Sequence, residues 1–195
     1  MYSTLSLYNL ALARLGGNEL ATLSAPGEGS RLASLCNTLF PHVCNLAFGA
    51  HAWAFALTEE TLAPVHEPNA LLQGEYGLAY ALPVACLRPV RLMGQGEEHR
   101  PPSFAVSGPT LYCDLAPARL QYVRRVHDTA RWPAHFVEVV VWGLAAELCA
   151  SYLNDPARQK LCMERAQRAL QMAMATDAAG TQPKRKPFLW EEARG

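Results

Sequence analysis

The 195-residue chain is half hydrophobic, and only 17% of its residues are charged. That apolar content is enough to bury a sizeable core and excludes global disorder. Lysine and arginine together number 17, as do aspartate and glutamate, so the formal net charge is zero and the basic excess of a dedicated DNA-binding domain is missing. This balance favours protein partners and is compatible with dense self-association, because a near-zero charge weakens self-repulsion.

Two helices are predicted in the first fifty residues. The first spans residues 3–16, where apolar residues recur at helical spacing and Ser3 suits the N-cap position. Gly16 follows its last turn, where glycine commonly ends a helix. The second helix spans residues 30–50 and begins near Ser30.

The periodicity changes between residues 51 and 127. Trp53, Phe55 and Leu57 alternate with alanines at a spacing of two, which predicts a strand. Further short alternating runs, separated by glycines and prolines, predict more strands of an antiparallel sheet. These runs lie at residues 76–82, 90–92, 104–106, 111–113 and 120–126. The region is therefore predicted to be a small β-insertion between helices.

Two more helices are predicted after the insertion, at residues 133–153 and 156–178. Asp155 is a natural N-cap for the last helix, and Pro156 suits its first position. The predicted class is α+β: an antiparallel bundle of about four helices with an inserted small antiparallel β-sheet. Together these elements are expected to form one domain over residues 1–179.

The helical pattern ends near Gly180, and residues 180–195 are predicted to form an extended C-terminal arm. Pro183 and Pro187 forbid a continuous helix there. A basic tripeptide precedes a bulky apolar triad, which is typical of a short peptide that orders on a partner. The six residues are Lys184, Arg185, Lys186, Phe188, Leu189 and Trp190. A merely disordered tail is the alternative, because chain termini are often loose.

The candidate metal ligands are cysteines and histidines in or beside the second helix. They are Cys36, His42, Cys44 and His51. On a continuous helix His42 points well away from Cys44 and His51, and no tetrahedral zinc spacing occurs. We therefore expect core thiols, surface histidines, and neither a metal ion nor another cofactor.

Short sequence pieces that follow one another over residues 3–178 give the chain a recognisable pattern. They are NLALARLGG at residues 9–17, HAWAFA at 51–56, YALPVACLR at 80–88, WPAHF at 132–136, LAAEL at 144–148, and Asp177. In order and spacing they resemble the tail tubular protein A family of short-tailed bacteriophages, the head-to-tail adaptors, including prophage copies. The WxFA and YxLPxxCLR steps are the most specific pieces of this resemblance.

The resemblance implies a virion structural protein without catalytic residues. It implies a dodecameric ring that docks under the portal protein, extends the DNA channel, and presents a surface to the next tail component, a nozzle or tubular protein. Double-stranded DNA would only pass through the channel. Such a subunit belongs to the neck of the virion and is in the host cytoplasm during assembly. We count no apolar run of membrane-spanning length, so no membrane partner is expected.

Two other functions stay open as alternatives. A tail-associated muralytic hydrolase needs two acids across a cleft, whereas Glu59-Glu60 is an adjacent pair on a predicted strand and Glu97-Glu98 lies at a turn. Solvated surface carboxylates are the simpler interpretation. A DNA-binding packaging accessory would use basic residues, and those on or near the last strand are Arg119, Arg124 and Arg125. These arginines could contact DNA in the channel, but zero net charge favours salt bridges between neighbouring subunits.

Overall fold

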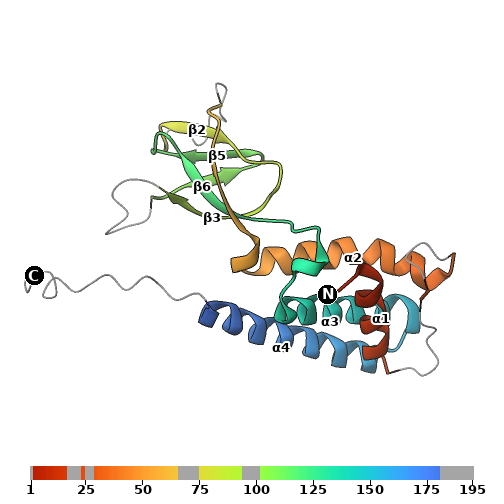
Figure 1. Cartoon of the computed structure of the whole chain (residues 1–195). Helices are drawn as coiled ribbons and strands as arrows, with labels where there is room; N and C mark the ends of the chain where they lie inside the picture. The colour runs from red at the N-terminus through yellow and green to blue at the C-terminus, as the bar shows by residue number, and fades with distance from the viewer. Residues whose placement is uncertain (1, 17–22, 25–28, 66–74, 94–101, 181–195) are drawn as a thin grey trace, which may run out of the picture.

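The computed structural model describes residues 2–16, 23–24, 29–65, 75–93 and 102–180. Its described part is a helical bundle with two small antiparallel sheets at one end (Figure 1). The helices are α1 (Thr4–Arg14), α2 (Arg31–Ala50), α3 (Ala134–Leu148) and α4 (Pro156–Gly180). The α+β class predicted from the sequence is confirmed.

The helix starts follow the capping chemistry that the sequence predicts. The Ser3 hydroxyl accepts a hydrogen bond from the Ser6 amide of α1 at 3.1 Å, and the Ser30 hydroxyl accepts one from the Ala33 amide of α2 at 3.2 Å. At α4, the Asp155 carboxylate accepts a hydrogen bond from the Arg158 amide at 3.0 Å. These local caps explain why the predicted starts of the helices are accurate to about one residue.

α3 is the central helix, and α1, α2 and α4 pack around it (Figure 1). α2 and α4 run in one direction and α3 in the other, as Figure 1 shows, so both flanking helices are antiparallel to the centre. A Cβ atom added at Gly143 of α3 would lie 2.9 Å from Cγ1 of Val43. The glycine therefore permits the close approach of α2 to α3.

The segment Ala134–Leu153 comprises α3 and the π-helical turn Cys149–Leu153 that continues it. It is long and apolar enough to cross a membrane by length and composition, with a mean hydropathy of 1.6. The expectation that no run reaches this length is therefore wrong. In the bundle, the apolar side chains of this segment pack against the three surrounding helices, which accounts for its composition.

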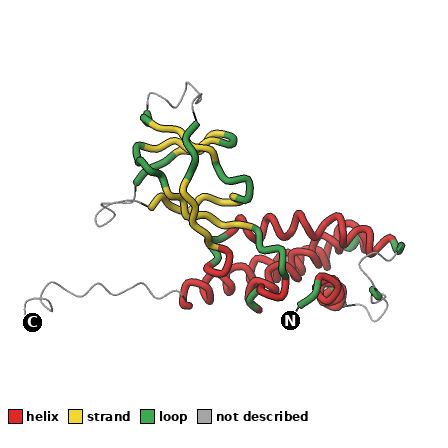
Figure 2. The backbone as a smooth tube through the Cα atoms, turned by 45° about the horizontal axis from the view of Figure 1, so that its top comes forward, coloured by secondary structure: helices red, strands yellow, loops and turns green. Residues whose placement is uncertain are grey.

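The β-insertion contains two three-stranded sheets instead of the single sheet expected (Figure 2). The strands are β1 (Leu57–Thr61), β2 (Leu78–Ala81), β3 (Cys86–Met93), β4 (Ala105–Ser107), β5 (Thr110–Cys113) and β6 (Arg119–Arg124). β6 is the central strand of the first sheet, between β1 and β3, and β5 is central in the second, between β2 and β4. All of these strand pairs are antiparallel.

The predicted strand around Trp53 is wrong at its start. Ala54–Ala56 form a 3-10 turn, η1, and β1 begins only at Leu57. The Ala56 amide donates to the Trp53 carbonyl oxygen at 2.9 Å, which closes the turn. Trp53 and Ala56 are both buried in the bundle core. Alanine suits a helical turn and a strand alike, so its alternation with aromatic residues does not distinguish the two.

Two apolar cores result from this arrangement. The larger core fills the bundle and includes Trp53 of the loop before η1 and Val123 of β6. The smaller core lies within the sheets and takes residues from both of them. Its buried members are Leu62, Tyr80, Leu92, Leu111, Cys113, Ala118, Leu120 and Tyr122. Residues 51–56, between the end of α2 and the start of β1, lead from the bundle into the sheets, and we call this segment the junction.

Candidate functional site

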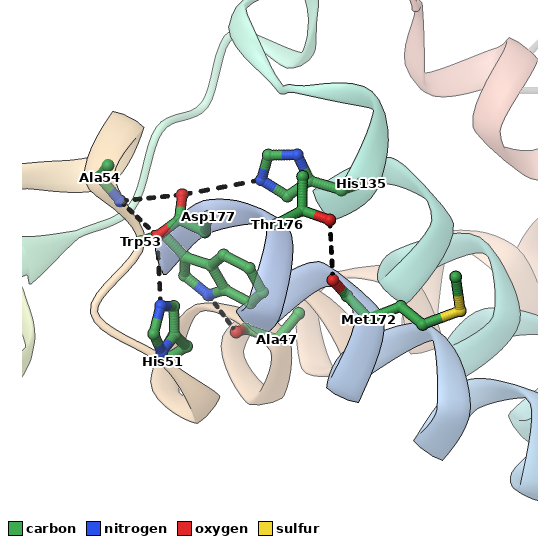
Figure 3. Close-up of polar contacts among 8 residues, drawn as sticks. All are labelled: Ala47, His51, Trp53, Ala54, His135, Met172, Thr176 and Asp177. Carbon is green, nitrogen blue, oxygen red and sulfur yellow. Dashed lines mark hydrogen bonds and ion pairs between the residues drawn. The ribbon is translucent and has the colours of Figure 1, made fainter. Parts of the chain in front are cut away.

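The junction is built around the carboxylate of Asp177, near the end of α4 (Figure 3). The Ala54 amide of η1 donates to both oxygens of this carboxylate, at 3.1 and 3.3 Å. Nε2 of His51, the residue that follows α2, lies 3.2 Å from Oδ2. Nε2 of His135, in the first turn of α3, lies 3.7 Å from Oδ1. We call these four residues the Asp177 clamp; they join α4 to the segment that leads from the bundle into the sheets.

Trp53 lies beneath the clamp and is completely buried. Its indole Nε1 donates to the Ala47 carbonyl oxygen in the last turn of α2 at 2.7 Å (Figure 3). Its ring meets those of His51 and Phe136 edge to face, with centroids 4.9 and 5.1 Å apart. Trp53 is therefore a core residue, and its ring anchors the segment that leaves α2.

A carboxylate beside a histidine can orient that histidine as a general base for a nearby hydroxyl or thiol nucleophile. The nearby Thr176 hydroxyl donates to the Met172 carbonyl oxygen at 2.9 Å, along its own helix (Figure 3). The nearest carboxylate oxygen to Nε2 of His135 is beyond hydrogen-bonding distance. The oxygens of Asp177 are engaged by a backbone amide and a ring nitrogen, which is the geometry of a structural contact.

The candidate metal ligands of the second helix are dispersed. Cys36 and Cys44 are buried in the bundle core and His42 is exposed, as expected. His51 is not a surface residue: it is partly buried and pairs with Asp177. Among the residues that the structure describes, no group of three or more His, Cys, Asp or Glu side chains could hold a metal ion.

Burial controls the chemistry of these two thiols. It raises the pKa of Cys36 to about 11 and that of Cys44 to about 12, although the charge of Arg125 acts in the opposite direction on Cys44. Only the thiolate is a strong nucleophile. At neutral pH both groups are therefore protonated and shielded.

We expect alkylation by iodoacetamide at pH 8 to be slow for Cys36 and Cys44 in the native protein and fast after unfolding in urea. The partly exposed Cys86 is the internal control and should react first. Mass spectrometry of tryptic peptides after timed quenching measures each rate. Equal native rates for Cys44 and Cys86 would contradict a buried position for the Cys44 thiol.

The adjacent carboxylates Glu59 and Glu60 are exposed on β1, yet both are engaged by neighbours. Glu59 accepts hydrogen bonds from the side chains of Arg119 and Gln121, at 3.2 and 3.1 Å. Glu60 accepts one from the Tyr122 hydroxyl at 2.8 Å. Burial and the neighbouring Glu60 raise the pKa of Tyr122 to about 12. These carboxylates connect β1 to β6, a more specific role than the solvated surface expected; Glu97-Glu98 lies outside the described residues.

The three arginines of the last predicted strand have different surroundings. Arg119 forms an ion pair with Glu59 of its own sheet, 3.2 Å apart, so it is already engaged within the subunit. Arg124 is exposed at the end of β6, five positions further on, and therefore lies on the opposite face of the strand. Arg125 is partly buried, near Cys44 of α2. Among the described residues, neither Arg124 nor Arg125 takes part in an ion pair.

The contribution of Asp177 to the junction was not predicted. The sequence places Asp177 in the adaptor-like pattern and assigns it no role. The HAWAFA piece supplies His51, Trp53 and Ala54, and the WPAHF piece supplies His135. The available signal in the sequence is that these residues belong to separate pieces of one pattern; Figure 3 shows that they meet. The predicted arm residues 184–190 lie outside the described residues.

No protein-family model matches the chain, and the comparison with curated proteins finds no match either. The resemblance to the adaptor family therefore rests on the sequence pieces alone.

Replacing Asp177 with alanine should lower the free energy of unfolding by about 2 kcal/mol, because a hydrogen bond to a charged, buried acceptor is lost. Thr176→Ala is the matched control, since that exposed hydroxyl bonds only to its own helix, and it should change stability by less than about 0.5 kcal/mol. Urea unfolding followed by circular dichroism measures both. Similar losses in the two variants would show that the clamp does not stabilise the junction.

Proposed function

We propose that the chain is a structural subunit of a phage head-to-tail adaptor, one copy in a dodecameric ring that docks under the portal protein. The ring extends the DNA channel and offers an attachment surface to a nozzle or tubular protein of the tail. Double-stranded DNA passes through the channel, and the subunit itself is not an enzyme. It is assembled in the host cytoplasm and is found in the neck of the virion.

One observation carries this proposal. Three pieces of the adaptor-like pattern lie up to 126 residues apart in sequence and meet at the Asp177 clamp. A sequence pattern that is spread along the chain has a structural explanation when its residues contact one another at one site. The clamp also suits a rigid building block, because it ties the end of α4 to the segment that leads from the bundle into the sheets.

The contacts with partners are part of the proposal. The arm residues Lys184, Arg185 and Lys186 would steer the arm to an acidic portal surface, and the following apolar triad would anchor it. Arg124 and Arg125 are the better candidates for contacts with a neighbouring subunit or the channel, since Arg119 already pairs with Glu59.

Alone in dilute solution, the protein should be mainly monomeric, and it should form higher oligomers on addition of the portal protein of the same virus. A head-to-tail contact that repeats around a symmetric template closes into a ring, whereas each single contact can be weak. Native mass spectrometry with and without portal measures this. A stable dimer as the only species in both samples would contradict the proposal.

A further inference from the structure

An open apolar groove lies on the bundle between α2 and α4, with a volume of about 310 Å³. α3 forms its floor, where Gly143 and Ala146 leave room because their side chains are small or absent. Figure 1 shows α2 and α4 on the two sides of α3, which is why the face of α3 between them is open. The groove is therefore a consequence of how the three helices pack.

The walls of the groove include long apolar side chains that are exposed to solvent. Leu46 of α2 is 58% exposed and Met163 of α4 is 57% exposed. Exposed apolar side chains that gather around one groove make it a candidate binding surface. The volume is at the lower end of the range for sites that hold small ligands. The groove consequently fits a few bulky side chains and is too small for another helix.

The chain itself supplies a segment of this kind. Fifteen residues follow Gly180, and their only run of large apolar residues is Phe188-Leu189-Trp190. Leu170, at the near end of the groove, is ten residues before Gly180 in α4, which is about 15 Å along a helix. The eight residues from Gly180 to Phe188 reach up to about 26 Å when extended. The triad can therefore reach the groove of its own chain.

We propose that Phe188, Leu189 and Trp190 occupy the groove between α2 and α4 of their own chain. A short tether keeps the triad at an effective concentration in the millimolar range, which favours its own groove over that of a second copy in dilute solution. The consequence for assembly rests on the proposed function: a portal that captures the arm uncovers the groove, so apolar contacts between subunits become available only at the portal. The contact itself does not depend on that function.

Limited trypsin digestion of the full chain tests the contact. Trypsin cleaves after Arg185 only when several residues on both sides of the bond are extended in its active site. Binding of the triad in the groove therefore slows this cleavage. Met163→Glu should raise the cleavage rate several-fold, because seating the apolar triad would take the new carboxylate out of water at a desolvation cost. Trp190→Ala should raise it as well, without any change in the bundle.

Met172→Glu is the matched control. Met172 is as exposed as Met163, at 63%, and lies nine residues further along α4, on the opposite face of the helix. Its substitution should leave the cleavage rate unchanged, and circular dichroism should show that all variants keep their helices. Equal cleavage rates for Met163→Glu and wild type would overturn the proposal. Cleavage that slows as the protein concentration rises would also overturn it, because the arm would then bind the groove of a second copy. Digestion of the free chain does not involve the portal, so its outcome is independent of the test of the proposed function.

Discussion

Replacing Trp53 with alanine should lower the free energy of unfolding by about 4 kcal/mol, the largest effect expected of a single substitution here. The side chain is completely buried and packs against the rings of His51 and Phe136. Its removal leaves a cavity beneath the Asp177 clamp and takes the indole donor away from the Ala47 carbonyl oxygen. Since domains of this size are stable by only about 5–15 kcal/mol, a large part of the stability is lost.

Trp142→Ala is the control for this substitution. Trp142 is also on the bundle but is only partly buried, and Arg14 lies over its ring, 5.2 Å from the centroid. Its loss should cost about 1 kcal/mol, the size of an exposed cation–π contact with modest burial. Urea unfolding followed by circular dichroism compares the two. If both variants lose the same stability, Trp53 is not an anchor of the junction.

Deleting residues 180–195 should leave the body folded and abolish or greatly weaken binding to the portal. Burying a Trp and a Phe contributes about 2 kcal/mol each, whereas ordering the arm costs about 1 kcal/mol or more per residue. Apolar anchors alone therefore do not order all sixteen residues on the portal, so the proposed binding requires backbone hydrogen bonds to the portal as well, such as an added strand.

Pull-down by immobilised portal measures the binding of the shortened chain, and two point variants test which arm residues contribute to it. Trp190→Ala should weaken binding more than Glu191→Ala, because the second change removes only a charge at the rim of the contact. Undiminished binding of the shortened chain would remove the arm from the mechanism and leave the bundle as the docking surface.

The parts of the fold that depend on neighbouring residues could be predicted from the sequence. Ser3, Ser30 and Asp155 cap helices because the atoms they bind are three residues away. The division of the strands into two sheets could not be predicted, because alternation indicates which face is buried and not which strand is the partner. β6 pairs with β1 across more than fifty residues, a choice that packing decides.

The candidate site, like the fold, has features that the sequence predicts and features that it does not. The sequence indicates that Trp53 is buried, since large aromatic residues among alanines favour packing against helices. It does not indicate that Asp177 accepts a hydrogen bond from an amide 123 residues earlier. Only tertiary packing brings the end of α4 to that amide. The apolar length of Ala134–Leu153 likewise becomes understandable only once three helices surround it.

Electron cryo-microscopy of the full chain bound to the portal protein of the same virus tests the proposed function most directly. We expect a ring of copies coaxial with the portal, its channel continuous with that of the portal, and the arm of each copy in contact with a portal subunit. Density for isolated copies away from the portal axis, or a portal without any bound chain at saturating concentration, would contradict the proposed role as a head-to-tail adaptor.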